Sequence, residues 1–232
     1  LSKNVFVAPN SNDCGLSTGA ILNYIKPTEP VELMYSGIPI LDIHTLPKTF
    51  SQDDETNSSE LANYLINENK IIGVMRGNSE HGPRALGNRT IFCNPTEKDM
   101  KDKLNKNVKN REWFRPFAPV VKEDQVNKYF EFDGKSPYMS FLVKVREEYR
   151  EKLPAITHVD GTARVQTVNS KDNPWLYDLL SKVEQLNGIP ILLNTSLNIN
   201  GKPIMSSIND MVELFNSTEI DGIMVEDYIL LK

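Results

Sequence analysis

The sequence predicts an α/β or α+β protein in which helices flank a mixed β-sheet. Short apolar runs are typical of buried strands, and they occur at 71–75, 138–143, 164–168, 189–193 and 223–230. Apolar residues at helical spacing predict helices near 60–69, 175–185 and 208–216. The 232 residues are 39% hydrophobic and 25% charged, which is ordinary for a globular protein and excludes a low-complexity or wholly disordered chain.

The chain divides into three parts. Residues 1–30 predict a strand at 5–8, a loop and a helix that ends before Pro27, which together look like the tail of an α/β unit. Residues 31–59 are punctuated by prolines and hold the polar run SQDDETNSS, so we expect a connecting segment. Residues 60–232 then form a second domain of about 170 residues, which is within the usual size of one domain.

Two helix starts within this domain carry capping patterns. Thr96 and Asp99 have the spacing of a capping box ahead of a helix, and Ser207 and Asp210 have it ahead of the helix at 208–216. We therefore expect both helices to begin at these residues.

The cysteines and the hydropathy of the chain indicate the cellular compartment in which it works. Cys14 and Cys93 are far apart and no CxxC occurs, which argues against a disulfide framework or a zinc cluster. No apolar run approaches the roughly 18 residues of a membrane span, and the first residues show neither a signal-peptide pattern nor an initiator Met. We expect a soluble, cytoplasmic chain that is a fragment of a longer protein.

Charge is unevenly distributed. The net charge is −5, but residues 76–122 carry a net +6, which leaves −11 for the remainder. An acidic protein with one basic block is suited to a compact anionic ligand, and the balance argues against nucleic acid as a partner.

The densest motif is RGNSEHGPRALGNR, from Arg76 to Arg89. Its three glycines allow backbone N–H groups to approach an anion, and Pro83 could begin a helical turn beside Arg84. The motif matches neither GxxxxGK[ST] nor GxGxxG. A structural turn with surface arginines remains the alternative.

Three further blocks place polar groups near predicted strands. KNREWFRPFAP carries Lys109 and Arg115 between aromatic residues, which could immobilise a cation for phosphate or carboxylate, or could cover the core. HVDGTARVQTV holds His158 and Arg164, where a structural hydrogen bond of the histidine and an ion pair of the arginine are the alternatives. The strand at 189–193 ends in NTSLN, which is a ligand position in open sheets or a simple turn.

Four blocks of the chain, in this order, resemble the carbamoyltransferase family that includes nodulation protein NodU and antibiotic O-carbamoyltransferases: GVMRGNSEHGPRALGNRTI, KNREWFRPFAP, HVDGTARVQTV and LLNTSLNINGKPI. Residues 4–24 resemble the end of the family's amino-terminal Kae1-like domain, which has an actin-like fold. The resemblance implies a YrdC-like carboxyl-terminal domain, with a twisted mixed sheet and flanking helices at 60–232, after a Kae1-like remnant at 1–30.

The resemblance also implies a reaction. The YrdC-like domain would activate carbamoyl phosphate with ATP and Mg²⁺ to carbamoyl-adenylate, and the Kae1-like domain, with bound iron, would pass the carbamoyl group to a hydroxyl. By similarity Arg84, Lys109, Arg115 and Arg164 are the candidates for catalytic contacts with phosphate and carbamoyl groups. The substrate-binding candidates are His81, His158, Asn194 and Ser196, with the last two expected to hold nucleotide or carbamoyl oxygens.

Asp13 aligns with the family's metal-binding aspartate, but Cys14 stands where the family has an acidic residue or glycine. The family's histidine ligands would lie upstream of residue 1, and one carboxylate does not hold catalytic iron. We therefore expect iron only in the complete protein, with the missing Kae1-like domain as partner. A nucleotide- or RNA-binding YrdC-like module, or a domain that only packs against the missing part, is the alternative function.

Overall fold

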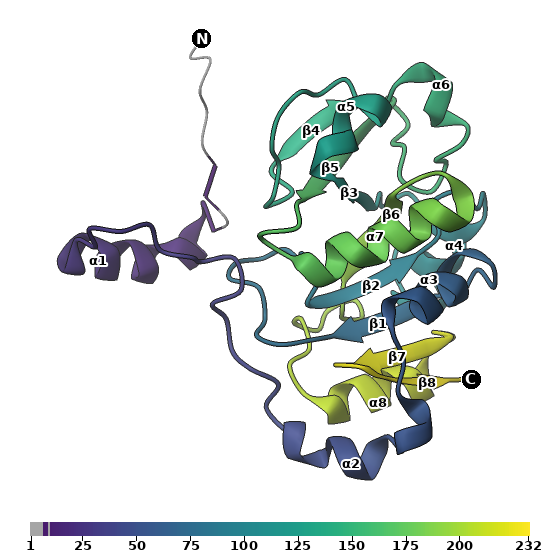
Figure 1. Ribbon diagram of the computed structural model, residues 1–232, viewed down its shortest axis with the longest axis horizontal. Helices are drawn as coiled ribbons and strands as arrows, with labels where there is room; N and C mark the ends of the chain where they lie inside the picture. The colour runs from purple at the N-terminus through teal and green to yellow at the C-terminus, as the bar shows by residue number, and fades with distance from the viewer. Residues whose placement is uncertain (1–6, 9) are drawn as a thin grey trace.

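The computed structural model describes residues 7–8 and 10–232, which contain one eight-stranded mixed sheet (Figure 1). Its strand order is β4-β5-β3-β6-β2-β1-β7-β8. The strands are β1 (Ile72–Met75), β2 (Arg89–Cys93), β3 (Ala118–Lys122), β4 (Phe141–Lys144), β5 (Thr162–Val168), β6 (Ile191–Ser196), β7 (Gly222–Val225) and β8 (Tyr228–Leu231). The pairs β1–β7 and β3–β5 are parallel and the other neighbours are antiparallel. The predicted mixed sheet with flanking helices is confirmed.

Helices cover both faces of the sheet. The α-helices are α1 (Leu16–Ile25), α2 (Leu46–Thr49), α3 (Ser58–Ile66), α4 (Met100–Lys103), α5 (Val126–Tyr129), α6 (Glu147–Arg150), α7 (Pro174–Asn187) and α8 (Ile208–Ser217). Helices α3 and α7 lie side by side over one face, and α8 packs beside β7 (Figure 1). Within the described residues, every helix is too short or too polar to span a membrane.

Apolar residues on both faces explain why the central strands are continuous apolar runs. In β6, Leu192 packs with α3 and α7, whereas Ile191 and Leu193 belong to the core on the opposite face. Successive side chains of a strand point to opposite faces, so a strand covered on both sides needs no polar alternation.

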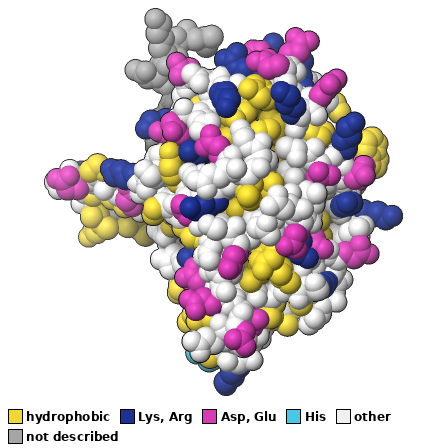
Figure 2. Space-filling view, turned by 45° about the vertical axis from the view of Figure 1, so that its right-hand side comes forward, with side chains coloured by type: hydrophobic (Ala, Val, Ile, Leu, Met, Phe, Trp, Pro, Cys, Tyr) yellow, Lys and Arg dark blue, Asp and Glu magenta, His cyan; other side chains and the backbone are white. Residues whose placement is uncertain are grey.

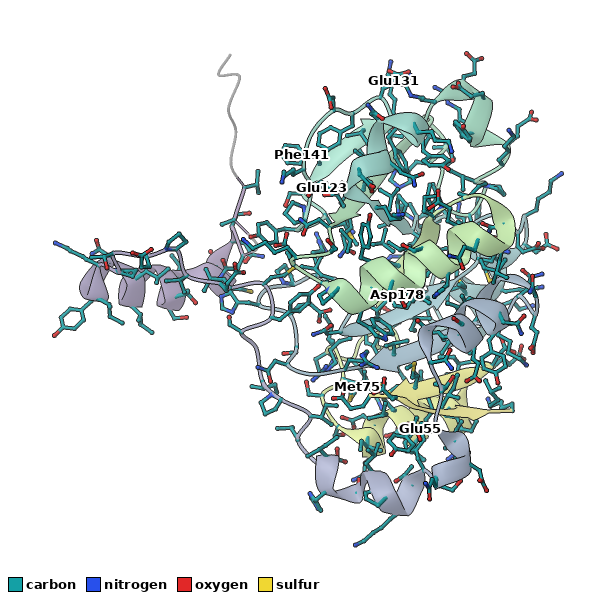
Figure 3. The ribbon with its side chains drawn as sticks, in the orientation of Figure 1. Glu55, Met75, Glu123, Glu131, Phe141 and Asp178 are labelled. Carbon is teal, nitrogen blue, oxygen red and sulfur yellow. The ribbon has the colours of Figure 1, made fainter. Side chains whose placement is uncertain are left out.

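The capping groups of the long helices follow from the sequence. Asn173 Oδ1 accepts from the N–H of Leu176, and Gly188 ends α7 in the left-handed conformation, with φ of 76°. Ser207 Oγ accepts from the N–H of Asp210, so the predicted cap of α8 is confirmed. Figure 3 shows Asp178 projecting from α7, where it accepts a hydrogen bond from Ser58 at the start of α3.

Two local predictions are wrong, and two strands were not predicted. The capping box from Thr96 does not form, because Thr96 donates to Asn94 Oδ1 at 2.8 Å and α4 begins only after Asp99, without a side-chain cap. The single strand expected at 223–230 is the hairpin of β7 and β8, since Glu226 turns the chain with φ of 51°. The sequence also gives no sign of β2 and β3.

Residues 31–59 pack against the sheet domain. Ile40 and Phe50 are buried in the main core, and the carboxylate of Asp42 accepts from the N–H of Ile208 at 2.6 Å at the start of α8. Helix α1, as predicted, is helical and projects away from the sheet (Figure 1). The strand predicted at 5–8 begins in residues 1–6, which lie outside the described residues.

Candidate functional site

The strongest candidate is a cavity of about 360 Å³. This volume lies within the range of about 300–1,000 Å³ that is usual for small-molecule sites. Five cations contribute to its lining: Arg84, Lys109, Arg111, Arg115 and Arg164. None of the described lining residues is acidic, so the cavity concentrates positive charge in an otherwise acidic chain.

A buried carboxylate shapes the loop that carries Arg84. Glu80 is 7% exposed, and its Oε1 accepts from the N–H groups of Leu86 at 2.8 Å, Asn88 at 2.7 Å and Arg89 at 3.1 Å. The helical turn expected at Pro83 is absent from this described loop, because a side chain rather than helical carbonyls takes up these N–H groups. Glu80 therefore fixes the loop that brings Arg84 to the cavity.

Arg89 closes the same loop from inside. Its side chain is fully buried, and its Nη1 and Nη2 donate to the carbonyl oxygens of Arg76 at 2.6 Å and Gly77 at 2.9 Å. A guanidinium with several carbonyl partners holds backbone rather than ligand. The arginines of this motif thus have different roles, and Arg84 is the one that lines the cavity.

Asn105 organises the second basic block. This fully buried residue lies in a π-helical turn, Leu104–Val108, and donates to the carbonyl oxygen of Arg115 at 3.0 Å. Its Oδ1 accepts from Arg111 Nε at 2.6 Å, while the Arg111 guanidinium lies 4.5 Å from the centroid of the Phe117 ring. Together these contacts immobilise one cation of the cavity.

Lys109 joins the second basic block to the turn after β6. Its Nζ donates to the carbonyl oxygen of Ser196 at 2.7 Å and to Oδ1 of Asn198 at 2.7 Å. Burial, with the charges of Arg111 and Arg115, lowers the pKa of Lys109 to about 7. The surrounding oxygens favour the ammonium and oppose this effect, so the protonation state of Lys109 is sensitive to an anion in the cavity.

The arginines of the cavity disfavour one another. Burial and the charge of Arg84 lower the pKa of Arg164, and burial and the charge of Arg115 lower the pKa of Arg111 to about 10, against a small effect of Glu112. Arg164 Nε and Arg111 Nη2 are buried without a hydrogen-bond partner among the described residues. A bound anion would relieve both the repulsion and the missing hydrogen bonds.

An amide network forms part of the cavity wall. Gln166 Nε2 donates to the carbonyl oxygen of Leu86 at 2.8 Å, and Asn194 Nδ2 donates to Gln166 Oε1 at 2.6 Å and to the carbonyl oxygen of Ala85 at 3.0 Å. This network ties β5 and β6 to the loop that carries Arg84. Among the lining residues, Asn194 Oδ1 is buried without a partner in the described part of the chain.

The structure brings together six of the residues that the sequence singles out, and they are Arg84, Lys109, Arg115, Arg164, Asn194 and Ser196. Further lining residues were not predicted, and Arg111, Thr195, Asn198 and Asn200 are the polar ones among them. Arg111, Thr195 and Asn198 belong to motifs that the sequence shows. Glu80, Asn105 and Gln166 support the site from outside the lining. Glu80 and Gln166 lie within two of the quoted motifs but were not singled out, and Asn105 lies outside all of them.

The two histidines lie away from the cavity lining. His81 Nε2 lies 2.5 Å from Asn10 Nδ2 and 3.1 Å from Thr18 Oγ1, so His81 connects the Arg84 loop with α1. His158 Nδ1 lies 3.2 Å from Thr162 Oγ1, and burial lowers the pKa of His158. Both side chains contact other residues of the chain, and their substrate-binding role stays a prediction.

The described lining of the cavity contains no carboxylate that could bind the expected Mg²⁺. Mg²⁺ is usually held by one or two protein carboxylates with substrate phosphates, but the described lining offers only neutral oxygens. Asp13 lies in the short helix Asp13–Gly15 and is exposed, and the described residues contain no group of three or more His, Cys, Asp or Glu residues that could hold a metal. The described residues fit neither Mg²⁺ at the cavity nor iron at Asp13.

Residues 63–232 match the family model described as Carbamoyltransferase C-terminus. The chain belongs to the carbamoyltransferase family. It is 38% identical to nodulation protein NolO of Bradyrhizobium diazoefficiens over 100% of this chain and 45% of that protein. It is 35% identical to the 3'-hydroxymethylcephem-O-carbamoyltransferase of Amycolatopsis lactamdurans over 97% of this chain and 43% of that protein.

The chain thus spans less than half the length of these two relatives. Among solved structures, it is similar to full-length HypF in the phosphate- and nucleotide-bound form, with a TM-score of 0.48 and 15% identity over 72% of this chain and 22% of that one. The matched carbamoyltransferase region contains all of the cavity residues, since these lie between Pro83 and Gly201.

Proposed function

We propose that this chain binds carbamoyl phosphate and ATP in the cationic cavity and activates the carbamoyl group as carbamoyl-adenylate, for O-carbamoylation of a hydroxyl acceptor. The observation that carries the proposal is the lining of five cations with no described acidic residue. Both substrates are polyanions, and phosphoryl chemistry depends mainly on fixed charges that position phosphate oxygens. Membership of the carbamoyltransferase family supports the carbamoyl group as the group transferred.

The proposed reaction consumes water. Water cleaves carbamoyl phosphate to carbamate and inorganic phosphate, and a proton is released. A carbamate oxygen then attacks the α-phosphorus of ATP, so that a new P–O bond forms while the bond to pyrophosphate breaks. Carbamoyl-adenylate retains the carbamoyl group, and pyrophosphate and inorganic phosphate leave.

The cavity residues divide this work between contact and positioning. Arg84, Arg115 and Arg164 supply charge toward phosphate oxygens, because their guanidinium groups are not engaged with several carbonyls as that of Arg89 is. Lys109 Nζ is surrounded by oxygens of Ser196 and Asn198, and we assign it the positioning of the turn after β6. The later transfer to the hydroxyl belongs, by the resemblance, to the Kae1-like domain.

Binding of nucleotide and release of pyrophosphate test the proposal. Calorimetry should show that the chain binds ATP at up to millimolar concentration, and the chain should release pyrophosphate only when ATP and carbamoyl phosphate are both present. Arg164→Met should weaken binding of ATP about 10-fold or more, as expected for a lost charge-assisted hydrogen bond. Lys171→Ala also removes one positive charge, but Lys171 is exposed outside the cavity lining and should leave binding unchanged.

Two outcomes would contradict the proposal. One is the absence of ATP binding with Mg²⁺ present in excess. The other is tight binding of single-stranded RNA that weakens steeply with salt while ATP does not compete, which would indicate a nucleic-acid module. On the face shown in Figure 2, cationic and acidic side chains are interspersed. A nucleic-acid module would instead gather its cationic side chains in one basic patch.

A further inference from the structure

The segment between α1 and α2 makes hydrogen bonds to two loops of the cavity. Residues 34–42 of this segment, which we call the strap, run from α1 toward α2 beside the sheet domain (Figure 1). The first loop, residues 79–86, carries Arg84, and the second loop, residues 197–206, carries Asn198. No strap residue is among the described lining residues, so any effect of the strap on the cavity passes through its neighbours.

Backbone hydrogen bonds join the strap to the start of the first loop. The N–H of Gly37 donates to the carbonyl oxygen of Ser79 at 3.0 Å, and the N–H of Ser79 donates to the carbonyl oxygen of Ile38 at 2.8 Å. The N–H of His81 donates to the carbonyl oxygen of Met34 at 2.9 Å. The two segments thus run antiparallel, and the strap fixes the backbone that leads into the cavity.

Tyr35 holds the other end of the same loop. Its hydroxyl group donates to the carbonyl oxygen of Leu86 at 3.1 Å and accepts from Asn173 Nδ2 at 2.8 Å. Burial raises the pKa of Tyr35, so the phenol stays protonated and continues to donate. Gln166 donates to the same carbonyl oxygen at 2.8 Å, and a carbonyl oxygen has two lone pairs. Leu86 is therefore held between the strap and β5.

The strap is also attached to the second loop. The N–H of Leu41 donates to the carbonyl oxygen of Ser206 at 2.9 Å, and the carboxylate of Asp42 accepts from the N–H of Ile208 at 2.6 Å. Residues 198–201, shortly before Ser206, line the cavity. One short segment thus connects two loops that contribute to the lining.

An apolar contact reaches the lining itself. Met34 is buried in a cluster with Leu86, Ala118 and Met139, of which the last two line the cavity. Met139 has φ of 55°, a conformation that a residue other than glycine adopts only when its surroundings enforce it. Met34 is part of those surroundings, so a shift of the strap would also change the cavity wall.

We propose that the strap positions both loops for anion binding, with Tyr35 and Gly37 as its positioning residues. This inference rests on the proposed function in taking the cavity as the anion site, and it adds residues from outside the lining. A cavity whose loops are already in place has less to order when an anion binds, so its affinity is higher. If the loops occupy that arrangement only part of the time, the apparent affinity falls by the same fraction.

Gly37→Ala tests the close approach of the strap to the first loop. An added Cβ would collide with Ser79 Oγ and lie 2.6 Å from the carbonyl oxygen of Ser79, so the strap must move away. Calorimetry on the full chain below the melting temperature should show sulfate binding about 10-fold more weakly. Gly19→Ala adds the same methyl group where no atom lies within 4 Å, and it should leave sulfate affinity unchanged.

Tyr35→Phe is a milder variant that keeps the ring and removes only the hydroxyl group. Loss of the hydrogen bond to Leu86 should weaken sulfate binding about 3- to 10-fold. Tyr24→Phe removes a hydroxyl group from a tyrosine of α1 that is 89% exposed, and it should bind sulfate like the unmodified chain.

Urea denaturation of the same variants separates positioning from stability. A strap that only stabilises the fold would lower the free energy of unfolding and leave the sulfate affinity of the folded chain unchanged. Unchanged sulfate affinity of folded Gly37→Ala, or of Tyr35→Phe where Gly37→Ala does not fold, overturns the strap while the unmodified chain still binds sulfate and ATP. Failure of the unmodified chain to bind either anion overturns the proposed function and the strap with it.

Discussion

Lys109 Nζ donates to both the side-chain oxygen of Asn198, at 2.7 Å, and its carbonyl oxygen, at 2.8 Å. The N–H of Asn200 donates in return to the carbonyl oxygen of Lys109 at 3.0 Å. The turn after β6 is therefore attached to the second basic block at two points. The hydrogen bonds of Lys109 help to fix the shape of the cavity, and its positive charge adds to the electrostatic potential there.

The first prediction is that anion binding takes up a proton at Lys109. Burial and the charges of Arg111 and Arg115 lower the pKa of Lys109 to about 7, and an anion in the cavity raises that pKa again, so at about pH 8.5 more protons are bound in the complex than in the free chain. Sulfate is a suitable probe because it does not titrate in this range. The heat of binding is measured in two buffers of different ionisation enthalpy. The difference between the two heats should correspond to the uptake of up to about one proton per sulfate.

The control for this experiment is Lys109→Arg. Arginine stays charged at this pH, so the variant should bind sulfate with the same heat in both buffers. Identical heats for the unmodified chain would show that Lys109 is already charged before the anion arrives.

The second prediction concerns Asn105. Asn105→Ala removes hydrogen bonds to Arg111 and to the carbonyl oxygens of Trp113 and Arg115, all within the segment that lines the cavity. Because Asn105 is fully buried and its partners are partly buried, losing these hydrogen bonds should lower the free energy of unfolding by about 1–3 kcal/mol. Urea denaturation measures this loss. Asn107→Ala, in the same turn, removes one exposed hydrogen bond to Glu219 and should cost less than about 1 kcal/mol.

The sequence predicts those helices and strands whose caps and apolar residues lie within the element itself. Helices α7 and α8 carry their own caps and apolar faces, and β6 is a continuous apolar run, so periodicity is sufficient for all three. Strand β3 is different because Pro119 occupies a central strand, where proline normally argues against one. Pairing of β3 with β5 begins only at Val120, so the missing N–H of Pro119 is not needed there.

The sequence predicts the cationic residues of the site but not the residues that hold them in position. Arg84 and Arg164 stand out because cations in glycine-rich or strand sequences need an explanation. Gln166 looks like an ordinary polar residue, and its partner Leu86 lies 80 residues away in the chain. Contacts at such separations depend on the assembled sheet, and no local pattern specifies them.

The third prediction is that Glu80→Gln destabilises the Arg84 loop. The carboxylate accepts three N–H groups at one oxygen, and an amide oxygen in its place accepts them without the negative charge. We expect a loss of about 1–3 kcal/mol in the free energy of unfolding. Sulfate affinity should also fall, since Arg84 loses its fixed position. Glu68→Gln, at an exposed site, should change neither quantity, and equal stability of the two variants would exclude a positioning role for Glu80.

The fourth prediction separates backbone strain from packing at Gly87. Gly87 has φ of 128°, and an added Cβ would lie 2.8 Å from Leu176 Cδ2. Gly188 has φ of 76°, but no atom lies within 4 Å of its added Cβ. Gly188→Ala therefore measures conformational strain alone, at about 1–2 kcal/mol.

Gly87→Ala causes backbone strain of about 1–3 kcal/mol and, in addition, a steric contact with Leu176. It should therefore lower the free energy of unfolding more than Gly188→Ala does. Because Gly87 lies in the loop that Glu80 fixes, the contact with Leu176 also displaces the segment that leads to Arg84. Sulfate affinity of the folded protein should fall for Gly87→Ala and stay unchanged for Gly188→Ala, as calorimetry below the melting temperature can measure. If the two alanine variants lose the same stability and bind sulfate equally, the close approach of Gly87 to α7 does not determine the geometry of the cavity.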